Sequence, residues 1–311
     1  MTPCDAPMRL AAAVTRDGRV TVRRALALCT MTAMLSTPPL AGQQKVPLVL
    51  HHLVIVLDSA TWHDVSTAPL LREQFAANFP HLSGRTLAVE RLGLIGKYNY
   101  FVFAAPHAAL ARQPGDVDIV LASEKPGAFD VLSAGGGYQR ETVSSESETS
   151  WGDLSTGYEV LRLAGPDSTS DHARFSIIQY TSNSARQAAV KDSLPISNLA
   201  VSRFLASRYL PGKLLAYVSS ATLAVPVDDI ARIVAVLKRD SITVFAEGEG
   251  AIIKLDGFTL HLIPPWAGAG VKQLQFALTR DVPANPVYSF GPRSQLRFGP
   301  GRIAVWDFGA R

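Results

Sequence analysis

One order of elements recurs along this chain of 311 residues and constrains its fold more than any other feature. A short apolar strand is followed by a polar turn, an amphipathic helix and then further strands. The order is clearest in the third copy, where Ala216–Val225 has the composition of a strand and a helix begins at Val227. Apolar residues of that helix recur at positions i, i+3, i+4 and i+7, namely Ile230, Ile233, Val234 and Leu237. Tandem units of strand, helix and three strands predict an α+β fold.

Further strands and helices are expected at the corresponding places of the other copies. The third copy continues with strands 242–246, 251–255 and 258–263. The first should contain strand 51–57, helix 60–77 bent or restarted at Pro69, and strands 85–90 and 98–103. The second should contain strand 117–122, a short helix after Pro126, and strands 158–163 and 174–180, with polar loops at 144–150 and 165–171. A degenerate fourth copy without a helix should contain strands 271–278, 295–298 and 302–308.

Pairs of such units are expected to curl into cupped mixed sheets. The first two units would form one domain at residues 43–193, and the last two would form a second, partly degenerate domain at residues 213–311. A helical linker is predicted at residues 194–212 because Pro211 and Gly212 end an amphipathic stretch. A small ligand can lie inside a cup of this kind.

Residues 1–42 have the composition of a signal peptide. Four arginines precede an uncharged stretch at residues 25–35, which is too short to span a bilayer, and small residues follow at Ala41 and Gly42. A buried helix with a basic leader is the alternative. We expect cleavage near residues 41–44 and a periplasmic or secreted protein, which the intact mass of exported material would show. No later stretch approaches 18 apolar residues, so we expect no membrane span in the mature form.

Removal of this leader changes the charge and the cysteine content. Five of the 30 basic residues and two of the 26 acidic residues lie in it, so the net charge falls from +4 to +1. A nucleic-acid partner would need a basic stripe, and the mature sequence has none. Cys4 and Cys29 are both removed. The mature chain should therefore contain no disulfide and no cysteine nucleophile.

Several short segments resemble an uncharacterised bacterial glyoxalase-like family, the DUF5829 group, within the vicinal oxygen chelate superfamily. The resemblance starts with Leu53–Ser59, Leu70–Phe75 and Gly96–Phe103. It continues in the same order through Phe175–Tyr180, Ala216–Pro264 and Gly270–Arg280. Collinearity of these segments supports the resemblance more than any one of them does. It implies a glyoxalase-like fold of tandem βαβββ units.

The same resemblance implies where a divalent metal would bind. Enzymes of the superfamily hold the ion through His, Gln and Glu side chains on inward-facing strand positions. The histidine of the first strand corresponds to His51, and strand alternation would turn His52 to the other face. The glutamate of the last strand corresponds to Val102, which cannot bind a metal. Asp118 and Gln179 are the nearest equivalents in the second unit, so His51, Asp118 and Gln179 form only a weak metal site, and we expect weak or no metal binding.

Aromatic and histidine side chains suggest a ligand site without a metal. The candidates lie in or after strands that should line a cup, and they are His51, Tyr98, Tyr100, Gln179, Phe258, His261 and Trp266, with Trp306 as a further member. Such a lining suits a mostly apolar small molecule. Ordinary core packing is the alternative for the aromatic residues, and a structural role is the alternative for His261.

Three functions remain open from the sequence. The first is an exported protein that binds a small, largely apolar organic ligand in a β-cup without a catalytic metal. The second is a metal-dependent lyase, isomerase or dioxygenase of the same superfamily. The third is a structural module that forms a homodimer. The sequence contains neither a Gly-x-Ser-x-Gly nor a His-Glu-x-x-His motif, so no catalytic residue is assigned.

Overall fold

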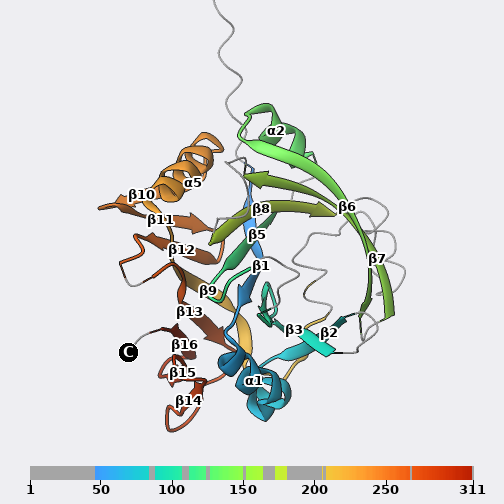
Figure 1. The fold of residues 1–311 in the computed structure, drawn as a ribbon, viewed down its shortest axis with the longest axis vertical. Coiled ribbons are helices and arrows are strands. Elements are labelled where there is room, and N and C mark those ends of the chain that lie inside the picture. The colour runs from blue at the N-terminus through green and yellow to red at the C-terminus, as the bar shows by residue number, and fades with distance from the viewer. Residues whose placement is uncertain are drawn as a thin grey trace, which may run out of the picture. The chain divides into compact units, whose positions relative to one another are not determined.

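The described strands form two eight-stranded mixed sheets, sheet A and sheet B (Figure 1). The computed structural model describes residues 46–83, 88–106, 112–123, 127–149, 152–163, 172–180, 205, 208–266 and 268–309. Few helices accompany these sheets, so the predicted α+β class is confirmed at this level.

Sheet A contains the strands from residue 48 to residue 180 in the order β2-β3-β4-β1-β5-β8-β7-β6. Their bounds are β1 Leu48–Val56, β2 Ala77–Ser83, β3 Ala88–Ile95, β4 Tyr100–Ala104, β5 Val117–Ser123, β6 Tyr138–Thr149, β7 Gly152–Leu163 and β8 Ala173–Tyr180. β1 is parallel to β4 and antiparallel to β5, and β5 is parallel to β8. Each half of the sheet therefore has its first strand beside its last strand, and the halves meet where β1 pairs with β5.

Sheet B follows the order β10-β11-β12-β9-β13-β16-β15-β14. Its strands are β9 Leu215–Ala224, β10 Thr243–Glu247, β11 Gly250–Leu255, β12 Phe258–Ile263, β13 Gly270–Leu278, β14 Val287–Phe290, β15 Ser294–Gly299 and β16 Ile303–Phe308. β9 is parallel to β12, whereas β13 is antiparallel to β16. The difference follows from the missing helix: the short connection at residues 279–286 cannot provide the long crossover that parallel strands require.

Three α-helices accompany the described strands: α1 Ser59–Thr67, α2 Ala128–Ala134 and α5 Val227–Arg239. Asp58 caps α1, since its carboxylate accepts hydrogen bonds from the Thr61 N–H at 2.9 Å and the Thr61 hydroxyl at 2.7 Å. The predicted apolar stripe of α5 is buried at Ile230, Ile233 and Leu237. No helix in the described part of the chain is long and apolar enough to cross a membrane.

Several local expectations are wrong. The predicted helix 60–77 restarts after Pro69, as expected, but its second part is only a π-helical turn at Leu70–Phe75, and β2 begins at Ala77. The predicted loop at 144–150 belongs largely to β6, which forms a strand although its sequence is mostly polar. β2 and β14 were not expected at all. The predicted loop 165–171 and, apart from Leu205 and the turn from residue 208, the linker helix 194–212 lie outside the described residues.

The main hydrophobic core includes side chains from both sheets and all three helices. On β1 the core residues are Leu48, Leu50, Leu53 and Ile55, which define the helix face of sheet A. Aromatic rings join the two sheets. Phe101 of β4 lies 5.2 Å from Phe276 of β13, and Phe103 lies 4.9 Å from Trp306 of β16, between ring centroids.

The opposite face of sheet A is called its inner face. The edge strands β2 and β6 contact each other although six strands separate them in the sheet order, so sheet A is strongly curled. Figure 1 shows β6 and β7 arching around one side of the sheet, with α2 outside the arch. The inner face is therefore the concave one.

A buried asparagine connects the sheets through the backbone. The Asn99 side-chain amide donates to the Val218 carbonyl at 3.0 Å, and the Asn99 side-chain oxygen accepts from the Val218 N–H at 2.7 Å. Val218 lies in β9 and Asn99 directly precedes β4. Loss of this side chain would leave two buried backbone groups without a partner.

We predict that Asn99→Ala lowers the free energy of unfolding by about 3 kcal/mol, because each unsatisfied buried polar group costs about 1–3 kcal/mol. Urea unfolding of the purified protein measures this change. Asn78→Ala is the control, since the Asn78 side chain makes one exposed hydrogen bond, to the Arg72 carbonyl. Equal destabilisation by the two substitutions would contradict the proposed link between the sheets.

Candidate functional site

A β-bulge in β1 brings two histidines to the inner face of sheet A. Leu50 pairs with Leu121 of β5 and His52 pairs with the next residue, Val120, so His51 is the extra residue. The bulge allows Leu50 and Leu53 to remain in the core while both intervening side chains lie on the inner face. Strict alternation predicted opposite faces for His51 and His52, and this prediction is wrong because alternation fails at a bulge.

The two histidines lie against Tyr100 of β4. Their Nδ1 atoms are 2.6 Å apart, so one Nδ1–H donates to the other Nδ1. The His52 ring is stacked on Tyr100 with centroids 4.6 Å apart, and His51 meets the same ring edge-on at 5.2 Å. His51 is 2% exposed, and its burial lowers its pKa to about 3. His51 is therefore a neutral hydrogen-bonding group at physiological pH.

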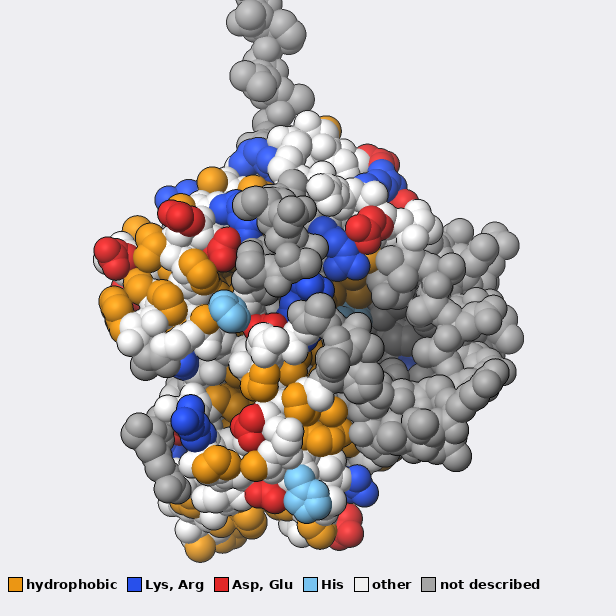
Figure 2. Space-filling view, in the orientation of Figure 1, with side chains coloured by type: hydrophobic (Ala, Val, Ile, Leu, Met, Phe, Trp, Pro, Cys, Tyr) orange, Lys and Arg blue, Asp and Glu red, His pale blue; other side chains and the backbone are white. Residues whose placement is uncertain are grey.

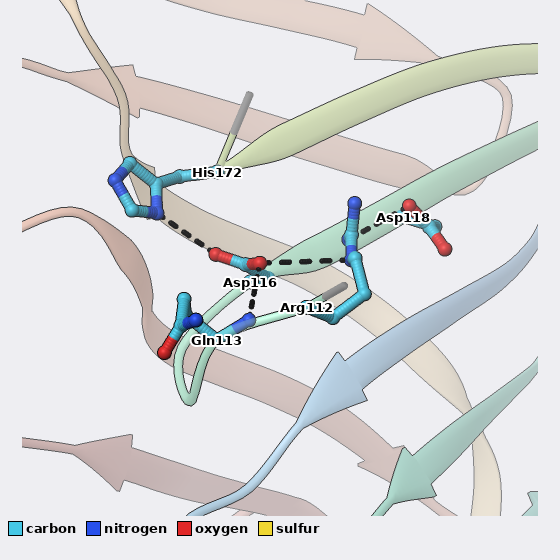
Figure 3. Close-up of polar contacts among 5 residues, drawn as sticks. All are labelled: Arg112, Gln113, Asp116, Asp118 and His172. Carbon is cyan, nitrogen blue, oxygen red and sulfur yellow. Dashed lines mark hydrogen bonds and ion pairs between the residues drawn. The ribbon is translucent and has the colours of Figure 1, made fainter. Parts of the chain in front are cut away.

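A charged cluster of Arg112, Asp116, Asp118 and His172 lies on the same face (Figure 3). His172 Nδ1 is 2.8 Å from Asp116 Oδ1, and Asp116 Oδ2 accepts a 2.7 Å hydrogen bond from the Gln113 N–H. Arg112 stands between the two carboxylates, with Nη2 2.8 Å from Asp118 Oδ1 and Nε 3.6 Å from Asp116 Oδ2. The cluster joins the loop before β5 to the beginning of β8.

Burial governs the electrostatics of this cluster. Desolvation raises the pKa of Asp118 above its ordinary value, and the positive charge of Arg112 opposes that shift. Desolvation likewise lowers the pKa of Arg112. Further guanidinium groups act on Asp118 from three strands, those of Arg174, Arg162 and Arg91. Figure 2 shows basic and acidic side chains gathered near the centre of this view, over β5 and β8.

The register places the histidines and the charged cluster along the same strands. Asp118 pairs with Val54 on one side and with Arg174 on the other, and Val54 also pairs with Val102. His52 therefore lies two residues along β1 from the row that contains Asp118. Beyond the histidines the face is apolar, with a small buried cluster of Val120, Ala122, Val160, Ile178 and Leu205. The inner face is thus charged at one end, aromatic in the middle and apolar at the other end.

Only some of the predicted ligand residues come together. His51 and Tyr100 are in contact, and Asp118 shares their face. Gln179 pairs with Glu159, whose carboxylate binds Arg140, and Arg140 also binds Asp130 of α2. Gln179 therefore lies on the helix face, opposite Asp118.

The remaining predicted residues lie elsewhere. Phe258 and Trp306 are buried in the main core, as the alternative of ordinary packing expected. Trp266 is 80% exposed in the loop after β12. Tyr98 is half exposed and meets Tyr217 edge-on at 5.7 Å. His261 lies in sheet B, where it pairs with Thr222.

Arg112 and His172 were missed from the sequence. They are 60 residues apart in the chain. The parallel pairing of β5 with β8 places the segments before these two strands side by side. Neither residue belongs to a recognisable motif. The one available indication was Asp116-Val-Asp118, two carboxylates at alternate positions where a buried strand begins.

A shallow cavity of about 150 Å³ lies apart from this face, at the end of sheet B formed by β14, β15 and β16. Its lining is polar and includes Arg293, Arg297 and Asp307. This volume is below the roughly 300–1,000 Å³ of typical small-molecule pockets. We therefore regard the inner face of sheet A as the stronger candidate.

A family model described as "Family of unknown function (DUF5829)" matches residues 50–308. The chain belongs to this family. The predicted resemblance to the DUF5829 group is thereby confirmed. No match was found among curated proteins.

Solved structures similar to this DUF5829 chain share little sequence with it. A hypothetical protein from Staphylococcus aureus is 8% identical with a TM-score of 0.43, and the match covers 71% of this chain and 88% of that one. A xylose isomerase-like TIM barrel/4-hydroxyphenylpyruvate dioxygenase fusion protein is 12% identical with a TM-score of 0.43, covering 75% of this chain but only 36% of the fusion. A putative dioxygenase from Bacillus subtilis subsp. subtilis str. 168 is 10% identical with a TM-score of 0.27, covering 84% of each chain.

The residues that the glyoxalase-like resemblance implied as metal ligands do not converge on one point in this DUF5829 chain. Val102 lies on the inner face without a donor atom, and Gln179 lies on the helix face. The Nδ1 atom of His51 already contacts His52. In the described ranges, no group of three His, Cys, Asp or Glu side chains is close enough to hold a metal.

We predict that His51 makes folding stability depend on pH. The unfolded chain gains a proton at residue 51 as pH falls below about 6.5, whereas the folded chain does not until about pH 3. Stability is therefore lost as pH falls, by about 2 kcal/mol between pH 7 and pH 5. Urea unfolding at both pH values should show this loss reduced in His51→Gln. His63→Gln, at an exposed position of α1, should retain it. The same loss in His51→Gln as in the wild type would contradict the prediction.

Proposed function

We propose that the chain is an exported glyoxalase-like protein of the vicinal oxygen chelate type, and that it binds a small, largely apolar organic ligand on the inner face of sheet A. The proposed role is binding without a catalytic metal. Export rests on the composition of residues 1–42, and the ligand site rests on the inner face.

The strand order supports the glyoxalase-like assignment. In three of the four units a strand is followed by a helix and three strands, and the last strand lies parallel to the first. Two units are joined side by side through their first strands in each sheet. The fourth unit departs from this scheme because it lacks its helix.

The bulge at His51 is the observation that carries the proposal. β-Bulges are over-represented beside functional sites because they redirect side chains, and this one turns two imidazoles towards Tyr100. The stacked pair of His52 and Tyr100 provides an aromatic surface with hydrogen-bonding groups at its edge. Val54, Val102 and Val120 are the apolar inner-face residues next to it. A mainly apolar surface with a few convergent polar groups is typical of small-molecule sites.

We predict that 2-naphthoate, 2-naphthol or both bind to the mature protein, and that Tyr100→Ala weakens this binding about tenfold, because stacking on one aromatic ring contributes about 1 kcal/mol or more. Isothermal titration calorimetry measures the affinity. Tyr217→Ala is the matched control, since Tyr217 lies in sheet B beside Tyr98.

Two results would contradict the proposed function. One is the absence of binding for both naphthalene probes to the folded protein. The other is binding that Tyr217→Ala weakens as much as Tyr100→Ala does, because the probes would then not depend on the inner face of sheet A.

A further inference from the structure

We propose that the ligand of the inner face is a small organic acid and that Arg112 binds its anionic group. This inference rests on the proposed function and specifies the chemical class of the ligand. The apolar part of the acid would lie along the aromatic and apolar portion of the face, and the anion would lie in the charged cluster.

Arg112 is a buried side chain whose hydrogen-bond donors are only partly used. Its side chain is 6% exposed, and one guanidinium nitrogen, Nη2, lies 2.8 Å from Asp118. Both terminal nitrogens are buried and make no well-aligned hydrogen bond among the residues that the structure describes, and Nη1 has no ion-pair partner there either. A guanidinium group has five N–H donors in a planar fork, and a carboxylate matches two of them at once. Nε of Arg112 also lies 3.6 Å from Asp116, so Nη1 is the nitrogen that remains for a further acid group.

Several positive charges surround Asp118. The guanidinium groups of Arg112, Arg174, Arg162 and Arg91 all stabilise a negative charge at Asp118, in that order of strength. They come from the loop before β5 and from β8, β7 and β3. A second anion beside Asp118 would experience the same positive field, which opposes the desolvation that raises the pKa of Asp118.

The charged end of the inner face is more exposed to water than its apolar end. His172, at the charged end, is 43% exposed, whereas Leu205 at the apolar end is 2% exposed. Asp118 and Ala122 mark the two ends on β5, and four residues of strand span about 13 Å. An acid with one or two rings matches this length, with its anion towards water and its rings towards the apolar end.

Substitutions of Asp118 and Arg112 should change the affinity for the acid in opposite directions. The Asp118 carboxylate shares Arg112 with the incoming anion and repels it, so the neutral isostere in Asp118→Asn should strengthen acid binding. Removal of the guanidinium in Arg112→Gln should weaken it. A cluster with a purely structural role would not give opposite effects on affinity at these two positions.

The experiment compares 2-naphthoate with 2-naphthamide, which has the same shape without the charge, by calorimetry at pH 7. The wild type should bind the acid about tenfold more tightly than the amide, because a hydrogen bond to a charged group contributes that much. Arg112→Gln should abolish the preference, and Asp118→Asn should increase acid affinity about threefold or more. Arg302→Gln, in the exposed turn between β15 and β16, should match the wild type.

The outcomes separate this inference from the proposed function. Equal binding of acid and amide, with Tyr100→Ala weakening both, would overturn the acid but keep the ligand site. Binding of neither 2-naphthoate nor 2-naphthamide would overturn the acid, and absence of 2-naphthol binding as well would overturn the proposed function. If Arg112→Gln does not fold, Asp118→Asn decides: higher acid affinity with unchanged amide affinity supports the inference, and unchanged or lower acid affinity overturns it.

Discussion

The pairing of β1 with β5 determines what the inner face of sheet A can present. β1 connects the two halves of the sheet, because it lies parallel to β4 on one side and antiparallel to β5 on the other. The core fixes Leu50 and Leu53 on the helix face, so the extra residue between them must be accommodated as a bulge. Two histidines consequently lie on the concave side, beside a tyrosine from β4. The same pairing brings Asp118 into a row with Val54 and Val102, and through β8 with Arg174.

Burying charged groups costs free energy unless they are paired. In the cluster around Arg112 the pairing is incomplete. Asp116 has three partners, namely the Gln113 N–H, His172 and Arg112. Arg112 itself has a buried nitrogen without a hydrogen bond in the described structure. Replacing such a cluster with apolar residues is often neutral or stabilising. A buried ion pair with unused donors therefore indicates a function more readily than a contribution to stability, and the neighbouring aromatic and apolar surface indicates which function.

Sequence patterns predicted the elements whose side chains form the core. The strands around Ile119 and Leu260 and the helix with Ile230 and Leu237 are apolar at the expected period, because each buries one face. The loop predicted at residues 144–150 belongs largely to β6, because an edge strand tolerates polar residues such as those of Tyr138–Thr149. The bulge at His51 and the approach of Arg112 to Asp118 depend on register and on pairing across the sheet. Local sequence does not encode these features, so neither the shared face of the two histidines nor the charged cluster could be predicted.

The central claim is that a small acid binds along the inner face of sheet A with its anion at Arg112. A crystal structure of the mature protein grown with 6-bromo-2-naphthoate tests this claim most directly, because the anomalous scattering of bromine locates the ring system independently of the protein model. We expect a bromine peak on the inner face, towards Val120 and Ala122, with the carboxylate within hydrogen-bond distance of Arg112. A bromine peak on sheet B, or a carboxylate directed away from Arg112, would contradict it.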